Sequence, residues 1–134
     1  MRALRALPAH RPADMLRAMY LGHTELFVKD PRASRDFYER VLGFTVTDVQ
    51  HNGAIIWLQL GDRVILLRVG VRPPTAPNYQ RAGQALVFFS DDLAAEMRAL
   101  ESRGLVFNGD DGPGCPTFTD PDGNWFQLVD PRHS

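Results

Sequence analysis

The stretch His23-Thr-Glu-Leu-Phe-Val-Lys-Asp-Pro31 decides the fold of this chain, because it combines a period-two strand pattern with a helix start. A weaker copy, Gln84-Ala-Leu-Val-Phe-Phe-Ser-Asp-Asp92, begins 61 residues later. In each copy an aspartate, Asp30 or Asp91, lies thirteen residues before a glycine, and both intervals carry a helical apolar pattern. The sequence therefore predicts two copies of one module.

The first module begins with a strand over residues 20–28 and a helix from Asp30 to about Leu42. Alternation along the strand separates one face, with Thr24, Leu26 and Val28, from a second face with His23, Glu25, Phe27 and Lys29. Aspartate followed by proline favours a helix N-terminus, and Gly43 is a typical helix stop. Apolar residues four apart predict the buried stripe of the helix at Ala33, Phe37 and Val41.

Three further strands are predicted in this module, over residues 44–49, 54–60 and 64–69. A turn at His51-Asn-Gly53 joins the first two, since Asn-Gly supplies the positive φ angles of a tight hairpin. The module is therefore βαβββ. In its last two strands the helix-facing residues are expected to be Leu58, Leu60, Ile65 and Leu67, and those on the other face Trp57, Gln59, Val64, Leu66 and Arg68.

Residues 70–83 are rich in proline and glycine without periodicity and are expected to link the modules. The second module is predicted as a strand over 84–89, a helix capped within Ser90-Asp-Asp92, and strands over 105–108, 116–119 and 125–129. The helix should bury Leu93, Met97 and Leu100 and stop at Gly104. Asp120-Pro-Asp-Gly-Asn124 is expected to form the turn into the last strand.

Composition restricts the partners. The 134 residues suit one domain, expected over residues 20–134 with modules at about 20–70 and 84–131, after an N-terminal extension over 1–19 or a later natural start at Met15 or Met19. Fifteen Lys plus Arg against sixteen Asp plus Glu give no basic patch for nucleic acid or an anionic membrane. One cysteine and no long apolar run favour a cytoplasmic protein with a small-molecule partner.

The ordered motifs resemble a known family. His23 and Asp30, then Phe37-Tyr38 with Leu42-Gly-Phe44, then Leu60-Gly-Asp62, then Asp120-Pro-Asp-Gly-Asn124 are similar to the vicinal oxygen chelate superfamily of glyoxalases, bleomycin-resistance proteins and extradiol dioxygenases. The resemblance covers residues 20–131. It implies an α+β fold in which two βαβββ modules form a cupped mixed sheet, and it implies a homodimer.

The family's metal ligands lie on cup-facing positions of the first and last strands of each module. The resemblance carries them to His23, Leu66, Gln84 or Ala85, and Gln127. Only His23 is of the usual type, because Gln127 stands where a glutamate is common and Leu66 cannot bind a metal. Glu25, which lies two residues after His23 on the same face, is the candidate for the missing negative charge. No cofactor is favoured, and the metal alternative rests on His23 and Gln127.

The expected cup combines aromatic, apolar and amide side chains, which suits a flat or amphipathic ligand. The candidate binding residues are His23, Glu25, Phe27, Trp57, Gln59, Gln84, Trp125 and Gln127, with Val64 and one of Phe118 or Phe89 beside them. The alternative is that these aromatics pack a dimer interface or a closed core.

Two function hypotheses follow. The first is a metal-free binding protein that holds an aromatic or amphipathic compound between Trp57 and Trp125. The second is a divalent-metal-dependent lyase, isomerase or thiol transferase of the glyoxalase type. A catalytic role for Cys115 has little support, because no basic partner or helix N-terminus is evident beside it.

Overall fold

The computed structural model describes residues 18–71 and 75–132, so most of the expected N-terminal extension lies outside the described residues. The chain divides into two compact units, Met1–Glu39 with Gly43–Arg72, and Arg40–Leu42 with Pro73–Ser134. Each unit is described by itself. No helix among the described residues has the length and apolar character needed to cross a bilayer.

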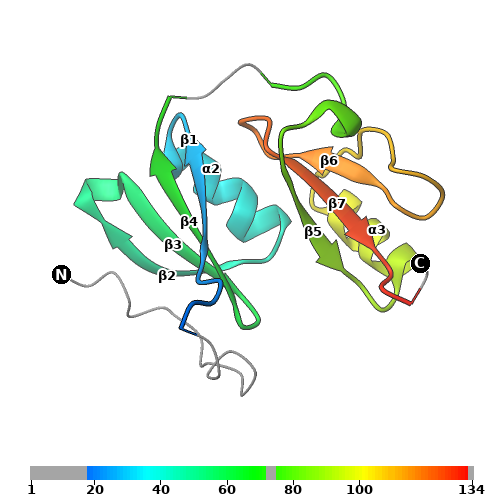
Figure 1. Cartoon of the computed structure of the whole chain (residues 1–134), viewed down its shortest axis with the longest axis horizontal. Coiled ribbons are helices and arrows are strands. Elements are labelled where there is room, and N and C mark those ends of the chain that lie inside the picture. The colour runs from blue at the N-terminus through cyan, green and yellow to red at the C-terminus, as the bar shows by residue number, and fades with distance from the viewer. Residues whose placement is uncertain (1–17, 72–74, 133–134) are drawn as a thin grey trace. The chain divides into compact units, whose positions relative to one another are not determined.

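The first unit holds one four-stranded mixed sheet and confirms the predicted βαβββ order (Figure 1). Its spatial order is β1-β4-β3-β2, with β1 parallel to β4 and the other pairs antiparallel. The predicted turn after β2 is confirmed as a short 3-10 turn with positive φ at His51, Asn52 and Gly53. In chain order the elements are β1 (Thr24–Val28), α2 (Pro31–Asp36), the π-helical turn η1 (Phe37–Val41), β2 (Thr45–Gln50), η2 (His51–Gly53), β3 (Ile55–Leu60) and β4 (Arg63–Val69).

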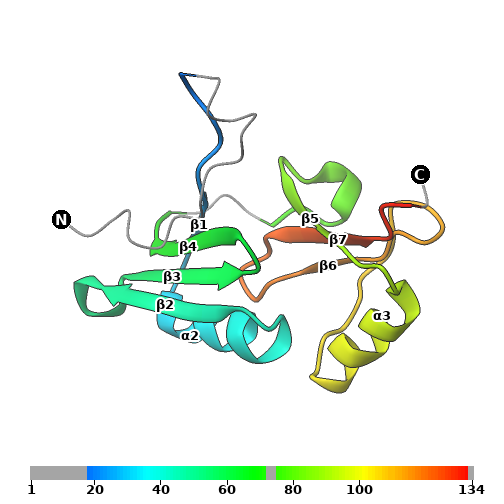
Figure 2. The ribbon, with the colours of Figure 1, turned by 90° about the horizontal axis from the view of Figure 1, so that it is seen from below.

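The helix of the first unit covers one face of its sheet (Figure 2). Asp30 is the N-cap, and its Oδ1 accepts a hydrogen bond from the backbone N–H of Arg32 at 3.0 Å. Leu26 and Val28 of β1 are buried, as the strand pattern predicts. Leu58, Ile65 and Leu67 are buried too, whereas Leu60, two residues after Leu58 in the same strand, lies at the strand end with 37% of its surface exposed.

The predicted helix stripe is wrong by one residue. The helix buries Pro31, Ser34 and Tyr38, while Ala33 is exposed and Phe37 and Val41 are half-buried. The sequence-based prediction placed only apolar side chains, Ala33, Phe37 and Val41, in the buried stripe. In the structure the Tyr38 ring is fully buried and makes edge contacts with Phe37 and Phe44, so a large aromatic ring fills the space under the helix.

The second unit holds a three-stranded sheet of order β5-β7-β6, with β5 parallel and β6 antiparallel to β7. The strand predicted over 105–108 is not formed. Asn108 and Thr117 exchange backbone and side-chain hydrogen bonds, but no ladder continues because glycines with positive φ at 109, 112 and 114 turn the chain. The elements are η3 (Tyr79–Arg81), β5 (Ala85–Phe89), α3 (Leu93–Ser102), β6 (Thr117–Thr119) and β7 (Trp125–Val129).

The core of the second unit is a stack of three phenylalanine rings, Phe88, Phe118 and Phe126, with centroids 5.2–6.3 Å apart. Phe118 is therefore a core residue and not a cup-facing one, which removes it from the two cup-facing candidates, Phe118 and Phe89, that the sequence left open. Leu100 of α3 is buried as predicted, and Leu93 and Met97 are half-buried. The predicted turn after β6 is confirmed, since buried Asp120 accepts three hydrogen bonds from Asp122 and Asn124.

The two helices show that the modules repeat with two different offsets. The N-cap of α3 is Asp92, not Asp91, so the caps Asp30 and Asp92 lie 62 residues apart (92 − 30). The glycines that follow the helices, Gly43 and Gly104, lie 61 apart (104 − 43). The π-helical turn η1 accounts for the difference, because a π-turn accommodates one residue more than regular α-helix.

Candidate functional site

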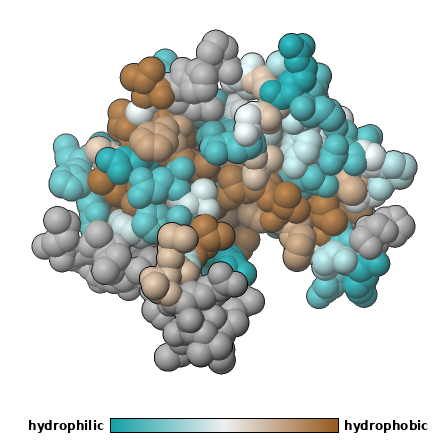
Figure 3. Space-filling view, in the orientation of Figure 1, coloured by the Kyte–Doolittle hydropathy of each residue, from teal (hydrophilic) through white to brown (hydrophobic). Residues whose placement is uncertain are grey.

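The face of the first sheet opposite α2, here called the helix-free face, collects most of the predicted site residues. Strand alternation places Glu25 and Phe27 of β1 on this face. The register pairs Leu66 with both Glu25 and Trp57, and pairs Arg68 with Phe27. Figure 3 shows hydrophobic surface interspersed with hydrophilic surface over the first unit. This face is therefore amphipathic.

A chain of three charged or titratable side chains crosses β1 and β4. His23 Nε2 and Glu25 Oε2 lie 2.9 Å apart, and Arg68 Nη1 donates to Glu25 Oε1 at 3.1 Å. The hydrogen bond from His23 lowers the pKa of Glu25, an effect that Arg68 reinforces and partial burial opposes. Both Glu25 oxygens are thus engaged, and the carboxylate favours its ionised form.

The aromatic residues of this face differ in exposure. Trp57 is 2% exposed, packs with Val64 and Leu66, and meets the His23 ring at a centroid distance of 4.8 Å. Its indole N–H donates to Gln50 Oε1 at 3.2 Å. Phe27 is 46% exposed, and the Arg68 guanidinium carbon lies 5.6 Å from its ring centroid. Phe27, not Trp57, therefore offers the accessible ring.

Gln59 lies at the end of the face near the β3–β4 hairpin. Its side-chain amide donates to the Gly61 carbonyl at 2.9 Å, within the turn that joins β3 to β4. Gln59 is half-buried. Part of its hydrogen-bonding capacity is therefore used to close the hairpin.

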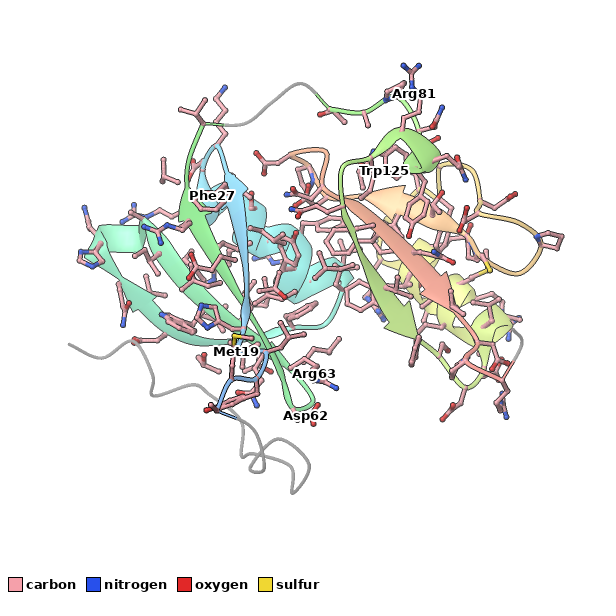
Figure 4. The ribbon with its side chains drawn as sticks, viewed as in Figure 1. Met19, Phe27, Asp62, Arg63, Arg81 and Trp125 are labelled. Atoms are coloured by element: carbon pink, nitrogen blue, oxygen red, sulfur yellow. The ribbon has the colours of Figure 1, made fainter. Side chains whose placement is uncertain are left out.

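In the second unit the predicted site residues of β7 are covered by the chain's own segment 75–81, here called the strap. The Trp125 indole N–H donates to the Ala76 carbonyl at 3.2 Å, and the Tyr79 ring meets the Trp125 ring edge-on at 6.1 Å. Gln127 Nε2 donates to the Tyr79 hydroxyl at 2.8 Å. Figure 4 shows Trp125 beside η3, the 3-10 turn that carries Tyr79. Trp125 is 3% and Gln127 8% exposed.

The register of β5 with β7 distinguishes Gln84 from Ala85 as the residue that shares the face of Gln127. Ala85 pairs with Trp125, and Val87 pairs with Gln127, so Ala85 shares the face of Gln127. Gln84 lies one residue before the strand, is exposed, and has the opposite parity. The same conclusion follows from the 62-residue offset of the caps, which makes Ala85 the counterpart of His23.

Sequence reasoning missed the two residues that define these surfaces. Arg68 was placed on the correct face but was not chosen as a binding residue. Its pairing with Glu25 depends on the parallel register of β1 with β4, which no local pattern reveals. Tyr79 lies in a segment predicted only as a linker. The one local signal was Asn78, which caps the turn η3 by accepting from the Arg81 backbone N–H at 3.2 Å.

Comparison with known proteins identifies the family. The sequence model described as Glyoxalase/Bleomycin resistance protein/Dioxygenase superfamily matches residues 20–128. The chain belongs to this superfamily. The comparison with curated proteins found no match.

Solved structures agree with the superfamily fold. VPC_CASS1, from the mobile metagenome of V. Pseudocholerae, is 30% identical with a TM-score of 0.61, covering 84% of this chain and 94% of that one. TnmS3, an antibiotic binding protein from Streptomyces sp. CB03234, is 27% identical with a TM-score of 0.60, covering 84% and 98%. The fosfomycin resistance protein FosX from Listeria monocytogenes, at 15% identity and a TM-score of 0.67 over 84% and 91%, shows the fold alone.

The superfamily implies a divalent metal in some members, and the donor set of this chain does not fit one. In the first unit His23 is accompanied by Leu66, and in the second Gln127 is accompanied by Ala85. Two of these four positions are apolar and a third is a neutral amide, so nothing but Glu25 would offset the charge of the ion. Among the described residues no three His, Cys, Asp or Glu side chains form a metal-binding group.

Proposed function

We propose that this superfamily member binds an aromatic or amphipathic small molecule on the helix-free face of the first sheet, and that binding needs no high-affinity divalent metal. The observation that carries the proposal is the half-exposed Phe27 ring beside the ordered Glu25 and Arg68 pair. The lining of small-molecule sites typically combines apolar and aromatic side chains with a few fixed polar groups.

Three further features support this reading. Trp57, Val64 and Leu66 form a packed apolar base on the same face, so the exposed groups stand on a rigid support. The donor set does not fit a divalent ion. TnmS3, which is 27% identical to this chain, is described as an antibiotic binding protein, and that likeness favours binding of an organic compound.

The test uses tryptophan fluorescence. Because the chain has two tryptophans, Trp125→Phe leaves Trp57 as the sole indole reporter. Naphthalene-2-carboxylate and naphthalene-2-carboxamide serve as aromatic probes, in buffer with EDTA. We expect saturable changes in Trp57 emission with at least one probe. Phe27→Ala should weaken binding about fivefold to tenfold, since it removes one ring contact of about 1–1.5 kcal/mol.

The matched control is Val49→Ala on β2. The exposed fraction of Val49, 45%, is close to the 46% of Phe27. Val49 lies on the opposite face of the sheet, because its cross-strand partner Ile56 is two residues before the helix-facing Leu58. Val49→Ala should leave probe binding unchanged. Absence of any saturable signal in EDTA, or equal losses in Phe27→Ala and Val49→Ala, would contradict the proposal.

One observation favours a second candidate, the metal-dependent lyase, isomerase or thiol transferase. The His23 and Glu25 side chains place an imidazole nitrogen and a carboxylate oxygen 2.9 Å apart, which are donor types that divalent metals accept. Equilibrium dialysis with Ni, Mn, Zn and Fe ions tests it. Stoichiometric binding that is lost in His23→Ala would favour this candidate over metal-free binding.

We also infer that the protein forms a homodimer, as the family resemblance implies. Large apolar side chains of β5, Val87 and Phe89, are 47% and 72% exposed in the single chain. Sedimentation velocity should give a mass of about 30 kDa, twice the 15.0 kDa of one chain. A single species at the mass of one chain would exclude a stable dimer.

A further inference from the structure

We infer that the ligand of the helix-free face carries an anionic group, a carboxylate or a comparable oxyanion, and that Arg68 recognises this group. The inference rests on the proposed function and specifies the class of its ligand. Arg68 becomes the residue that determines specificity, and Phe27 supplies the ring against which the ligand packs.

Arg68 is held in place by two contacts of different kinds. It stands on β4, in register with Phe27 on the neighbouring parallel strand β1. Its Nη1 donates to Glu25 Oε1 at 3.1 Å, and its guanidinium carbon lies 5.6 Å from the Phe27 ring centroid. A guanidinium fixed both by a carboxylate and over a ring loses little conformational entropy when it binds an anion.

Most of the hydrogen-bonding capacity of Arg68 is unused. A guanidinium carries five N–H donors. Within residues 18–71 and 75–132 the Glu25 carboxylate is the acceptor that Arg68 contacts, and 42% of the Arg68 side chain is exposed. The remaining donors are therefore available to a planar oxyanion, for which the guanidinium fork is well suited.

The negative charge of Glu25 does not reverse the preference of this face for an anionic ligand. One of its oxygens accepts from Arg68 and the other lies 2.9 Å from His23 Nε2, so its charge is compensated within the face. A cationic ligand would have to displace Arg68 both from the Glu25 carboxylate and from the Phe27 ring. An anionic ligand needs to displace neither group.

The experiment compares naphthalene-2-carboxylate with its neutral counterpart naphthalene-2-carboxamide, using Trp57 emission in the Trp125→Phe background. The carboxylate should bind about tenfold more tightly or better, because a charge-assisted hydrogen bond contributes more than a neutral one. In Arg68→Gln the two probes should bind within about twofold of each other. Arg68→Lys should retain part of the preference, since it keeps the charge but not the fork.

The matched control is Arg63→Gln, which removes the same charge from the same strand. Arg63 begins β4 at the hairpin (Figure 4). It lies five residues before Arg68 and alternates along the strand with Ile65 and Leu67, so it belongs to the opposite face from Arg68. It should leave the tenfold preference intact. Equal binding of the two probes to the parent, or an equal loss of preference in Arg63→Gln, would overturn the inference while the proposed function stands. Binding of neither probe would overturn both.

Discussion

Glu25 is the residue at which the charges of the helix-free face meet. The hydrogen bond from His23 and the contact with Arg68 both favour its ionised form. Because this carboxylate is the shared partner of His23 and Arg68, its protonation should loosen the arrangement that the proposed ligand would meet. The pH dependence of stability reports this directly.

Glu25→Gln should change how stability depends on acid. The pKa of Glu25 in the folded protein lies below its ordinary value of 4.5, with the His23 hydrogen bond as the largest cause. A lowered carboxyl pKa stabilises the fold above the unfolded value, and this contribution is lost as the pH falls through the folded pKa. The stability advantage of the parent over Glu25→Gln should therefore be present above about pH 5 and shrink as the pH falls below 4.5.

Urea unfolding between about pH 3 and 6 measures this difference. Glu101→Gln is the control, because Glu101 is an exposed carboxylate on α3 with no partner among the described residues. Its difference from the parent should vary much less with pH. A constant difference between the parent and Glu25→Gln across this range would contradict the assigned hydrogen bonds.

At the scale of elements, the strap and strand β7 behave as one packed unit. Gln127 is buried and donates to the Tyr79 hydroxyl, while Trp125 donates to the Ala76 carbonyl. Gly123 lies so close to Thr75 that a Cβ added at Gly123 would clash with the Thr75 hydroxyl. These contacts tie residues 75–81 to β7 and to the turn that precedes it.

Tyr79→Phe should destabilise the second unit by about 1–2 kcal/mol, because the buried Gln127 amide loses its acceptor. Gln127→Leu removes the other partner. In a double-mutant cycle the combined variant should be less destabilised than the sum of the two single variants, since no buried polar group is left unpaired. Urea unfolding of all four proteins measures the coupling, and strictly additive losses would show that the hydrogen bond does not form.

The cap of α3 gives a second test at this scale. Asp92→Ala should cost about 1 kcal/mol, because Asp92 Oδ1 accepts from the Ala95 backbone N–H at 3.1 Å. Asp91→Ala should stay within about 0.5 kcal/mol of the parent. Thermal or urea unfolding compares the two neighbours. A larger loss of stability for Asp91→Ala would mean that Asp91 is the cap. The caps would then lie 61 residues apart, like the glycines, and no extra residue in the π-turn η1 would be needed.

The choice of Asp92 as the N-cap of α3 shows what the sequence alone could not predict. The strands of the first unit were predicted from the alternation of apolar and polar residues. The glycines that end the two helices, Gly43 and Gly104, were predicted from their spacing to the preceding aspartates. The offset of 62 could not be seen, because an extra residue in a π-turn leaves the apolar pattern almost unchanged. Ser90, Asp91 and Asp92 are all acceptable cap residues, so the local choice was undetermined. Counting back from Asp91 gives Gln84 and counting back from Asp92 gives Ala85, so the sequence left both site positions open.

At the scale of the whole molecule, the two copies of the module differ in their strand number and in the surface that they present. The first unit keeps four strands and presents an amphipathic helix-free face. The second keeps three strands, lacks the predicted strand at 105–108, and carries a strap across its β7 residues. The superfamily follows from ordered motifs that local sequence displays. The proposed binding face depends on Phe27 and Arg68, and the covering of β7 depends on Tyr79. The partners of all three are set by long-range pairing that the sequence does not display.

The indole N–H resonances of Trp57 and Trp125 test whether ligand binding at the first sheet is independent of metal. They are assigned with Trp57→Phe and Trp125→Phe and followed by NMR during titration with naphthalene-2-carboxylate in EDTA. We predict a saturable shift of the Trp57 resonance that is weakened in Phe27→Ala and unchanged when a divalent metal replaces EDTA. A Trp57 resonance that stays fixed, or that moves only when metal is present, would contradict the account.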